Sequence, residues 1–349
     1  MFHSILKRRL FYKLPYNINI SHFIFNKKLH VLCNPSIPLY SKKYHRIGFL
    51  SAILCTIYLD NRSYQHSIPK LYFDKVYELA PMKILGEGAF GKVMKCIHKI
   101  HKTEAAVKVI LDCFDEALRE KETLTYIQLI GGHNNIIKLL DYFLHDGSHY
   151  LIVEYINGNS LYDEVCKKLL DKDIVYSIIN QISNIFTFMH QHGIVHCDLK
   201  PENIMVSHKS YIVKLIDFGS AIILNPQSST PNFEQIQKLI GIPVSGTKYY
   251  WPPEMLISED ISPAMDMWSV GCILFIMLTR QHPFDPKGNR TEAQIIEAIC
   301  NAPIEFTHPN WINISSDIKH IILRLLDKDK NTRMTSSELS ICIKTIINK

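Results

Sequence analysis

Acidic residues are missing from the first 59 positions of this chain, which hold nine Lys or Arg and no Asp or Glu. The rest of the chain carries 30 basic and 33 acidic side chains, so the formal charge of +6 comes from this leader. The remainder is slightly acidic and therefore lacks the basic balance typical of nucleic-acid-binding domains. We expect no nucleic-acid partner.

Other patterns are absent as well. The nine cysteines are scattered and never take Cys-x-x-Cys spacing, which argues against a disulfide framework or a zinc site and favours a reducing compartment. The apolar run over residues 47–59 has 13 residues, whereas a membrane-spanning helix needs about 20. The sequence contains no internal repeat, coiled-coil heptads or EF-hand loop, so we expect no calcium control within this chain.

Residues 1–60 form a basic N-terminal extension with more than one interpretation. Transit peptides are also poor in acids, but the start of this chain is not a clean signal peptide. We expect a disordered or loosely packed extension and a cytoplasmic protein. The alternatives are a segment that contacts a membrane or targets an organelle, an adaptor for membrane or nucleic acid, and an integral part of the next domain.

The densest group of polar residues lies between Gly193 and Asn203, with the sequence Gly-Ile-Val-His-Cys-Asp-Leu-Lys-Pro-Glu-Asn. Asp198 can take a proton from an attacking hydroxyl, and Lys200 can neutralise charge that develops on a phosphate. The amide oxygen of Asn203 can ligate magnesium. This loop therefore suits the transfer of a phosphoryl group.

Matching features flank this loop along the chain. Asp217 ends an apolar, strand-like run and is a second candidate magnesium ligand. Residues 84–93 contain three glycines between strand-like segments, where backbone amides can approach phosphates. Lys108 lies in the apolar strand Ala-Ala-Val-Lys-Val and needs an anionic partner, because an unpaired buried ammonium is costly. The next helical pattern offers Glu120, which we favour over Glu122.

Together these motifs resemble the eukaryotic protein kinase family from about Tyr77 to Ile347. Further matches are Pro-Pro-Glu254, Asp266 with Trp268, and Arg333. A Rossmann dinucleotide site also carries such glycines, but here a strand lysine follows them instead of a phosphate-binding helix.

The resemblance implies the roles of individual residues. Asp198 and Lys200 are the expected catalytic residues, and Asn203 and Asp217 the expected magnesium ligands. The residues expected to contact ATP are Leu85, Gly86, Glu87, Gly88, Ala89, Phe90, Gly91, Lys92, Val93, Ala106, Lys108, Glu120, Val153, Glu154, Ile156 and Met205.

The resemblance also implies structural roles for two contacts. We expect His196 to pack against Phe218, and Glu254 to form a buried ion pair with Arg333.

The expected architecture is α+β, a two-lobed protein kinase fold. The small lobe, residues 77–153, should contain a five-stranded antiparallel sheet and one main helix, and the large lobe, residues 154–347, should be mainly helical. We expect strands within 82–110, 136–144 and 148–154, and helices at 117–130, 173–192, 266–279 and 317–326.

The implied function is a serine/threonine kinase that uses ATP and Mg²⁺, acts on protein Ser/Thr hydroxyls and is a monomer. Lys200, two residues after Asp198, and Gly246-Thr247 before Pro252 support this type. A pseudokinase scaffold and a dual-specificity kinase are the alternatives. The latter lacks its usual pattern here, because Tyr249-Tyr-Trp stands before the Pro-Pro-Glu motif.

Some residues bear on subtype and control. His282-Pro-Phe-Asp and Trp311 resemble calcium/calmodulin-dependent-type kinases. At the position of Cys197 many kinases have an arginine, and that arginine binds a phosphate on the activation segment. We therefore expect activity that depends little on phosphorylation of residues 217–254. Glu202 can receive a basic side chain of the substrate.

Overall fold

A computed structural model describes residues 72–348, apart from 89–90, 112–113, 146 and 225–247. The chain divides into two units, Met1–Lys70 and Leu71–Lys349, and the fold below is that of the second. The predictions for residues 1–60 and for the greater part of the segment 217–254 fall outside the described residues. None of the described helices is both long and apolar enough to cross a membrane.

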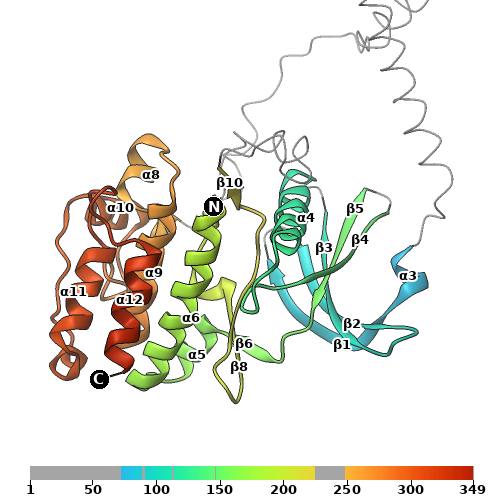
Figure 1. Cartoon of the computed structure of the whole chain (residues 1–349), viewed down its shortest axis with the longest axis horizontal. Helices are drawn as coiled ribbons and strands as arrows, with labels where there is room; N and C mark the ends of the chain where they lie inside the picture. Colours follow the sequence, from blue (N-terminus) through green and yellow to red (C-terminus); the bar gives the residue numbers. More distant parts are fainter. Residues whose placement is uncertain (1–71, 89–90, 112–113, 146, 225–247, 349) are drawn as a thin grey trace, which may run out of the picture. The chain divides into compact units, whose positions relative to one another are not determined.

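The small lobe is built on a five-stranded antiparallel sheet in the order β1-β2-β3-β5-β4 (Figure 1). The strands are β1 (Tyr77–Gly88), β2 (Gly91–His98), β3 (Glu104–Ile110), β4 (Leu139–His145) and β5 (Ser148–Glu154). A short helix, α3 (Phe73–Val76), precedes β1, and the main helix, α4 (Phe114–Leu129), packs on β4 and β5. The predicted sheet and helix are thus confirmed.

One predicted strand differs from the observed one. Residues 136–138 were expected to begin the fourth strand, but β4 begins at Leu139. Instead, Ile136 forms a parallel bridge with Leu215, and the N–H of Ile137 donates to the Leu215 carbonyl at 3.0 Å. The apolar pattern could not distinguish the two partners, because both place the side chains in a buried environment.

The large lobe is mainly helical, as predicted. Its helices are α5 (Leu161–Lys167), α6 (Lys172–Gln191), α8 (Pro253–Ser258), α9 (Pro263–Thr279), α10 (Glu292–Asn301), α11 (Ser316–Leu325) and α12 (Ser336–Ile347). Side-chain caps begin several of them: Ser160 accepts from the N–H of Asp163, and Thr335 forms a capping box with Glu338.

Helix α9 is the centre of this lobe and is buried along most of its length. It packs against α6 and α11, and α6 in turn packs against α12. Gly271 permits the approach of α11, because a Cβ there would lie 2.9 Å from the Cβ of Leu325. The apolar side chains of α6 and α9 join one core that reaches the small lobe through Ala106 and Val153.

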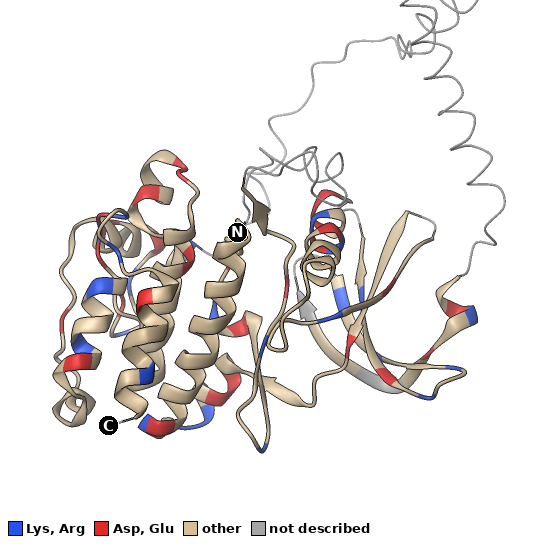
Figure 2. Cartoon of the chain, in the orientation of Figure 1, with Lys and Arg blue, Asp and Glu red and all other residues tan. Residues whose placement is uncertain are grey.

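Short strands and 3-10 helices complete the described part of the large lobe. They are β6 (Gly158–Ser160), β7 (Ile194–Val195), β8 (Ile204–Ser207), β9 (Val213–Leu215), β10 (Ile222–Ile223) and the 3-10 helices η1 (Pro201–Asn203), η2 (Lys248–Tyr250) and η3 (Pro309–Asn313). Their sheets have the orders β6-β8-β9 and β10-β7. Basic and acidic residues are interspersed over both lobes in the described part (Figure 2).

Candidate active site

The loop between β7 and β8 is held by a buried carboxylate from α9. Asp266 accepts hydrogen bonds from the backbone N–H of His196 at 3.0 Å and of Cys197 at 3.1 Å. Its Oδ2 also lies 3.0 Å from Nε2 of His190. Cys197 has φ of 66°, a left-handed conformation that is costly without such support. Asp266 therefore fixes the backbone immediately before Asp198.

Three polar side chains converge on this loop. The Nζ of Lys200 lies 2.7 Å from Oδ2 of Asp198. The Nδ2 of Asn203 donates to the Asp198 carbonyl at 2.8 Å and lies 3.3 Å from Oδ2 of Asp198. Because its nitrogen makes these contacts, Asn203 has its amide oxygen left to ligate a cation. The structure thus brings together the three residues predicted for this loop.

A second group of charges connects the two lobes. Lys108 on β3 places its Nζ 2.7 Å from Oε2 of Glu120 on α4 and 2.8 Å from Oδ1 of Asp217. The predicted contact of Lys108 with Glu120 is present. Glu122 pairs instead with Lys121, at 2.6 Å.

Lys108 and Asp217 stabilise each other's charge. Burial alone would lower the pKa of the Lys108 ammonium, but the negative charges of Glu120 and Asp217 raise it above its ordinary value. Burial pushes the pKa of Asp217 upward, yet the charge and hydrogen bond of Lys108 outweigh it and hold that pKa below its usual range. At neutral pH Lys108 is therefore protonated and Asp217 is ionised.

The turn after β9 aims the Asp217 carboxylate. Asp217 has φ of 64°, and its Oδ1 lies 3.4 Å from the backbone nitrogen of Gly219. Phe218 is fully buried and its ring centroid lies 5.1 Å from that of His196, so the predicted packing of His196 is present. The N–H of Phe218 also points to Oε1 of Glu120 at 3.4 Å. This contact ties helix α4 to the turn that carries Asp217.

The residues at hand fit a magnesium ion. Carboxylate and amide oxygens are the donors that Mg²⁺ prefers, and it is commonly held by one or two such groups together with substrate phosphates. Asp217 stays ionised, and Asn203 is buried beside Asp198 with its nitrogen already occupied. Asp217 and Asn203 would hold the ion.

The glycine-rich turn between β1 and β2 is tightly constrained at one end. Gly91 has φ of 150°, and a Cβ there would lie 1.8 Å from the carbonyl oxygen of Val109 on β3. Among the described residues, a Cβ at Gly86 would meet nothing within 4 Å. Ala89 and Phe90 lie outside the described residues. For Glu87 and Gly88 the structure describes the backbone alone.

The remaining predicted ATP contacts occupy neighbouring positions. Val93 pairs with Lys108 across β2 and β3, and Ala106 pairs with Val153 across β3 and β5. Glu154 ends β5, and Ile156 follows in the connection to the large lobe. Leu85 and Lys92 lie on β1 and β2, and Met205 lies on β8.

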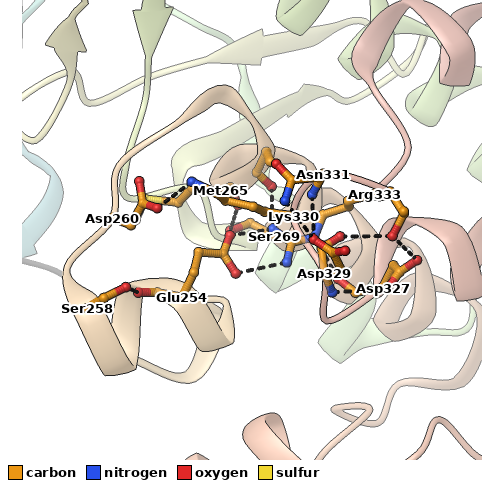
Figure 3. Close-up of polar contacts among 12 residues, drawn as sticks. Glu254, Ser258, Asp260, Met265, Ser269, Asp327, Asp329, Lys330, Asn331 and Arg333 are labelled. Atoms are coloured by element: carbon orange, nitrogen blue, oxygen red, sulfur yellow. Dashed lines mark hydrogen bonds and ion pairs between the residues drawn. The ribbon is translucent and has the colours of Figure 1, made fainter.

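An ion pair away from these groups ties the large lobe together. Arg333 binds Glu254 through two contacts, Nη1 to Oε1 at 2.6 Å and Nη2 to Oε2 at 2.9 Å. It also donates to the carbonyls of Ala264 and Asp327. Figure 3 shows Arg333 between α8 and the turn that precedes α12. The predicted buried pair is present, and it fixes the helix that follows the Pro-Pro-Glu motif.

The sequence patterns identified Asp266 as part of a motif but did not predict its bonds to the loop, and they did not single out Lys214 or Arg119. Lys214 is a lone charge in an apolar strand, which is the same signal that identified Lys108. Arg119, next to Glu120, is buried, and its Nε has no hydrogen-bond partner among the described residues. Burial lowers the pKa of the Arg119 guanidinium, which lies within electrostatic reach of Cys197.

Comparison with known proteins gives the class. The family model of the protein kinase domain matches residues 79–342, and the chain belongs to this family. The serine/threonine-protein kinase PKZ1 of Phytophthora infestans is 32% identical over 284 residues, which cover 73% of this chain and 67% of that protein. A putative ribosomal protein S6 kinase alpha-2 of Caenorhabditis elegans is 34% identical over 266 residues, which cover 74% of this chain and 34% of that protein.

A solved structure agrees with this assignment. The autoinhibited serine kinase domain of the giant muscle protein titin matches with a TM-score of 0.65 and 29% identity. The match covers 80% of this chain and 83% of the titin chain.

Proposed function

We propose that this protein is a serine/threonine kinase that transfers the γ-phosphoryl group of ATP to Ser or Thr hydroxyls of proteins. The observation that carries this proposal is the presence of two groups of side chains on segments joined by a backbone bond, in which the N–H of Ile216 donates to the Asn203 carbonyl at 2.9 Å. Asp198, Lys200 and Asn203 lie on one loop of the large lobe, and Lys108 joins Glu120 to Asp217. A pseudokinase scaffold would not need all of these groups.

The residues divide the work of an in-line phosphoryl transfer. Asp198 orients the acceptor hydroxyl and takes its proton as the hydroxyl oxygen bonds to the γ-phosphorus. The bond from that phosphorus to the bridging oxygen breaks, and ADP leaves. Lys200 stabilises the charge on the γ-phosphate, and Lys108 binds the α- and β-phosphates. A magnesium ion, which Asn203 and Asp217 would hold, would supply positive charge to stabilise the phosphates.

Substrate preference follows from the surface beside Asp198. Glu202 is exposed on η1, and its charge acts on Tyr162 of α5 and Tyr250 of η2. An exposed carboxylate near two aromatic rings suits a cationic side chain. Arg or Lys near the target hydroxyl is therefore the favoured substrate class.

The subtype and the setting of the protein stay predictions. The calcium/calmodulin-dependent subtype rests on the sequence alone, on His282-Pro-Phe-Asp and Trp311. Activity with little dependence on phosphorylation, a cytoplasmic location and a monomeric state are expected from the sequence.

The proposal is tested with the purified chain, Mg²⁺ and labelled ATP. Three Arg-containing peptides, identical except for Ser, Thr or Tyr at the acceptor position, serve as substrates. We expect label on the Ser and Thr peptides. Equal rates on the Tyr peptide would contradict the proposed specificity, and ATP binding without labelling of any peptide would support the scaffold interpretation.

A further inference from the structure

A charge pair joins the end of β5 to β9. The Nζ of Lys214 lies 2.5 Å from Oε1 of Glu154, which is 60 residues away in the sequence. The side chains are 16% and 26% exposed, so both charges are largely withdrawn from water. Lys214 also lies 3.5 Å from the carbonyl oxygen of Ile136. This pair belongs to neither of the two groups that carry the phosphoryl transfer.

The same carboxylate holds a third segment. Oε1 of Glu154 accepts the backbone N–H of Lys138 at 3.0 Å, and the N–H of Glu154 donates to the Lys138 carbonyl at 3.0 Å. Residues 135–137 are themselves bonded to β9, with the N–H of Leu215 donating to the Asn135 carbonyl at 2.8 Å. Glu154, the segment before β4 and β9 therefore form one bonded junction.

Both ends of the pair adjoin residues for which the kinase resemblance implies a contact with ATP. Glu154 begins the connection between the lobes, and its N–H donates to the Lys138 carbonyl. The resemblance implies that the backbone of Glu154 bonds adenine. Lys214 lies directly opposite Met205 in the β8–β9 ladder, and residues opposite each other share a face of a sheet. Met205 is one of the residues expected to contact ATP.

We propose that Lys214 is a positioning residue for the adenine end of the nucleotide site. By binding Glu154, Lys214 fixes the position of the connection between the lobes relative to Met205. Lys214 lies on β9, the strand that leads into Asp217. The inference rests on the proposed function, because it assumes that this cleft binds ATP. It assigns Lys214 no contact with the reacting atoms.

Because the pair is partly buried, we expect its loss to change the local structure. An exposed ion pair contributes little to stability, whereas removal of one partner of a partly buried pair leaves a charge without compensation. Glu154 without Lys214 would turn toward water and carry the backbone of its own segment with it. A purely structural role would lower the unfolding temperature and leave nucleotide affinity unchanged.

The experiment measures the Kd of ATP by titration calorimetry on the full chain, together with the unfolding temperature. We expect Lys214→Met and Glu154→Gln each to raise the Kd about fivefold to tenfold. The double variant should have a Kd no higher than that of the single variant with the higher Kd, because the two substitutions remove the same contact. Lys214→Arg, which keeps the charge, should stay within about twofold of the native chain.

The matched control is Arg324→Met, which breaks the Arg324–Glu338 pair of 2.9 Å between α11 and α12. It should leave the Kd of ATP unchanged. An unchanged Kd in Lys214→Met, or additive effects in the double variant, would overturn the inference. The Kd of ATP is measured without phosphotransfer. A protein that binds ATP but transfers no phosphoryl group would therefore contradict the proposed function, while the Kd values of the variants would still test the role of Lys214.

Discussion

The Nζ of Lys108 lies 2.8 Å from Oδ1 of Asp217, although 109 residues separate them. The contact joins β3 of the small lobe to the turn after β9, and Glu120 completes it from α4. In protein kinases the lysine–glutamate pair and the metal-binding aspartate must both be in place for transfer. In this structure Lys108 is in contact with both Glu120 and Asp217.

Glu120 should matter for activity in a way that Glu122 does not. Glu120→Gln removes the charge that holds Lys108, and misplacement of that lysine should lower kcat/KM by about 10²-fold. Glu122→Gln is the matched control, because Glu122 is equally buried but pairs with Lys121. Steady-state kinetics with ATP as the varied substrate measures both. Equal losses in the two variants would contradict the assignment.

Two glycines of the glycine-rich segment should differ in their tolerance of a side chain. Gly91→Ala places a Cβ against the carbonyl of Val109 at a position with positive φ, and should destabilise the fold by about 2 kcal/mol or more. Gly86→Ala meets open space and should leave the unfolding midpoint nearly unchanged. Thermal unfolding of both variants checks this, and equal midpoints would be inconsistent with the structure.

Removal of Arg333 should be among the most destabilising single changes in the large lobe. Its side chain is fully buried, and Arg333→Met would leave Glu254 buried without its partner, at a cost of about 3–5 kcal/mol. Arg333→Lys should not rescue, because lysine cannot make the two-pronged contact.

The control is Lys330→Met, which breaks the more exposed pair with Asp260 in the same network (Figure 3) and should cost at most about 1 kcal/mol. Denaturant unfolding gives both values. Similar costs for the two changes would argue against a structural role of the buried pair.

His282 should make the fold sensitive to acid. Burial lowers the pKa of this imidazole to about 4, and the ring sits between the Tyr249 carbonyl and the N–H of Phe284. Below the usual pKa of about 6.5 the unfolded chain binds a proton that the folded chain does not, so stability falls between about pH 6.5 and 4. Above that range His282 contributes no pH dependence.

Thermal unfolding of His282→Gln across this range should therefore show a shallower loss of stability than the native chain. His320→Gln, at an exposed position on α11, serves as control and should follow the native curve. A native slope in His282→Gln would show that this histidine is not the acid-sensitive group.

Local chemistry made much of the site predictable. Lys108 stands out because a charge in an apolar strand needs a partner, and Glu120 is the acid on the following helix that supplies it. Lys214 carries the same signal in β9, but its partner Glu154 is far away in the sequence and belongs to another strand. Local patterns identify that a charge needs a partner, whereas the topology decides which one it meets.

The same limit explains the error at residues 136–138. Ile136 and Ile137 are apolar, which indicates burial, and burial is satisfied equally by pairing with β5 or with β9. The bonds of Asp266 to the backbone of His196 and Cys197 could not be predicted from the sequence either, because they depend on how α9 crosses the loop.

The role of Asp198 is tested most directly by measuring phosphotransfer by Asp198→Asn beside the native chain, with the Kd of ATP measured on both. We expect the Kd of ATP to stay within about twofold, because Asp198 serves the acceptor hydroxyl, while transfer falls by about 10²-fold to 10⁴-fold. Unchanged turnover in the variant would show that Asp198 is not the catalytic carboxylate.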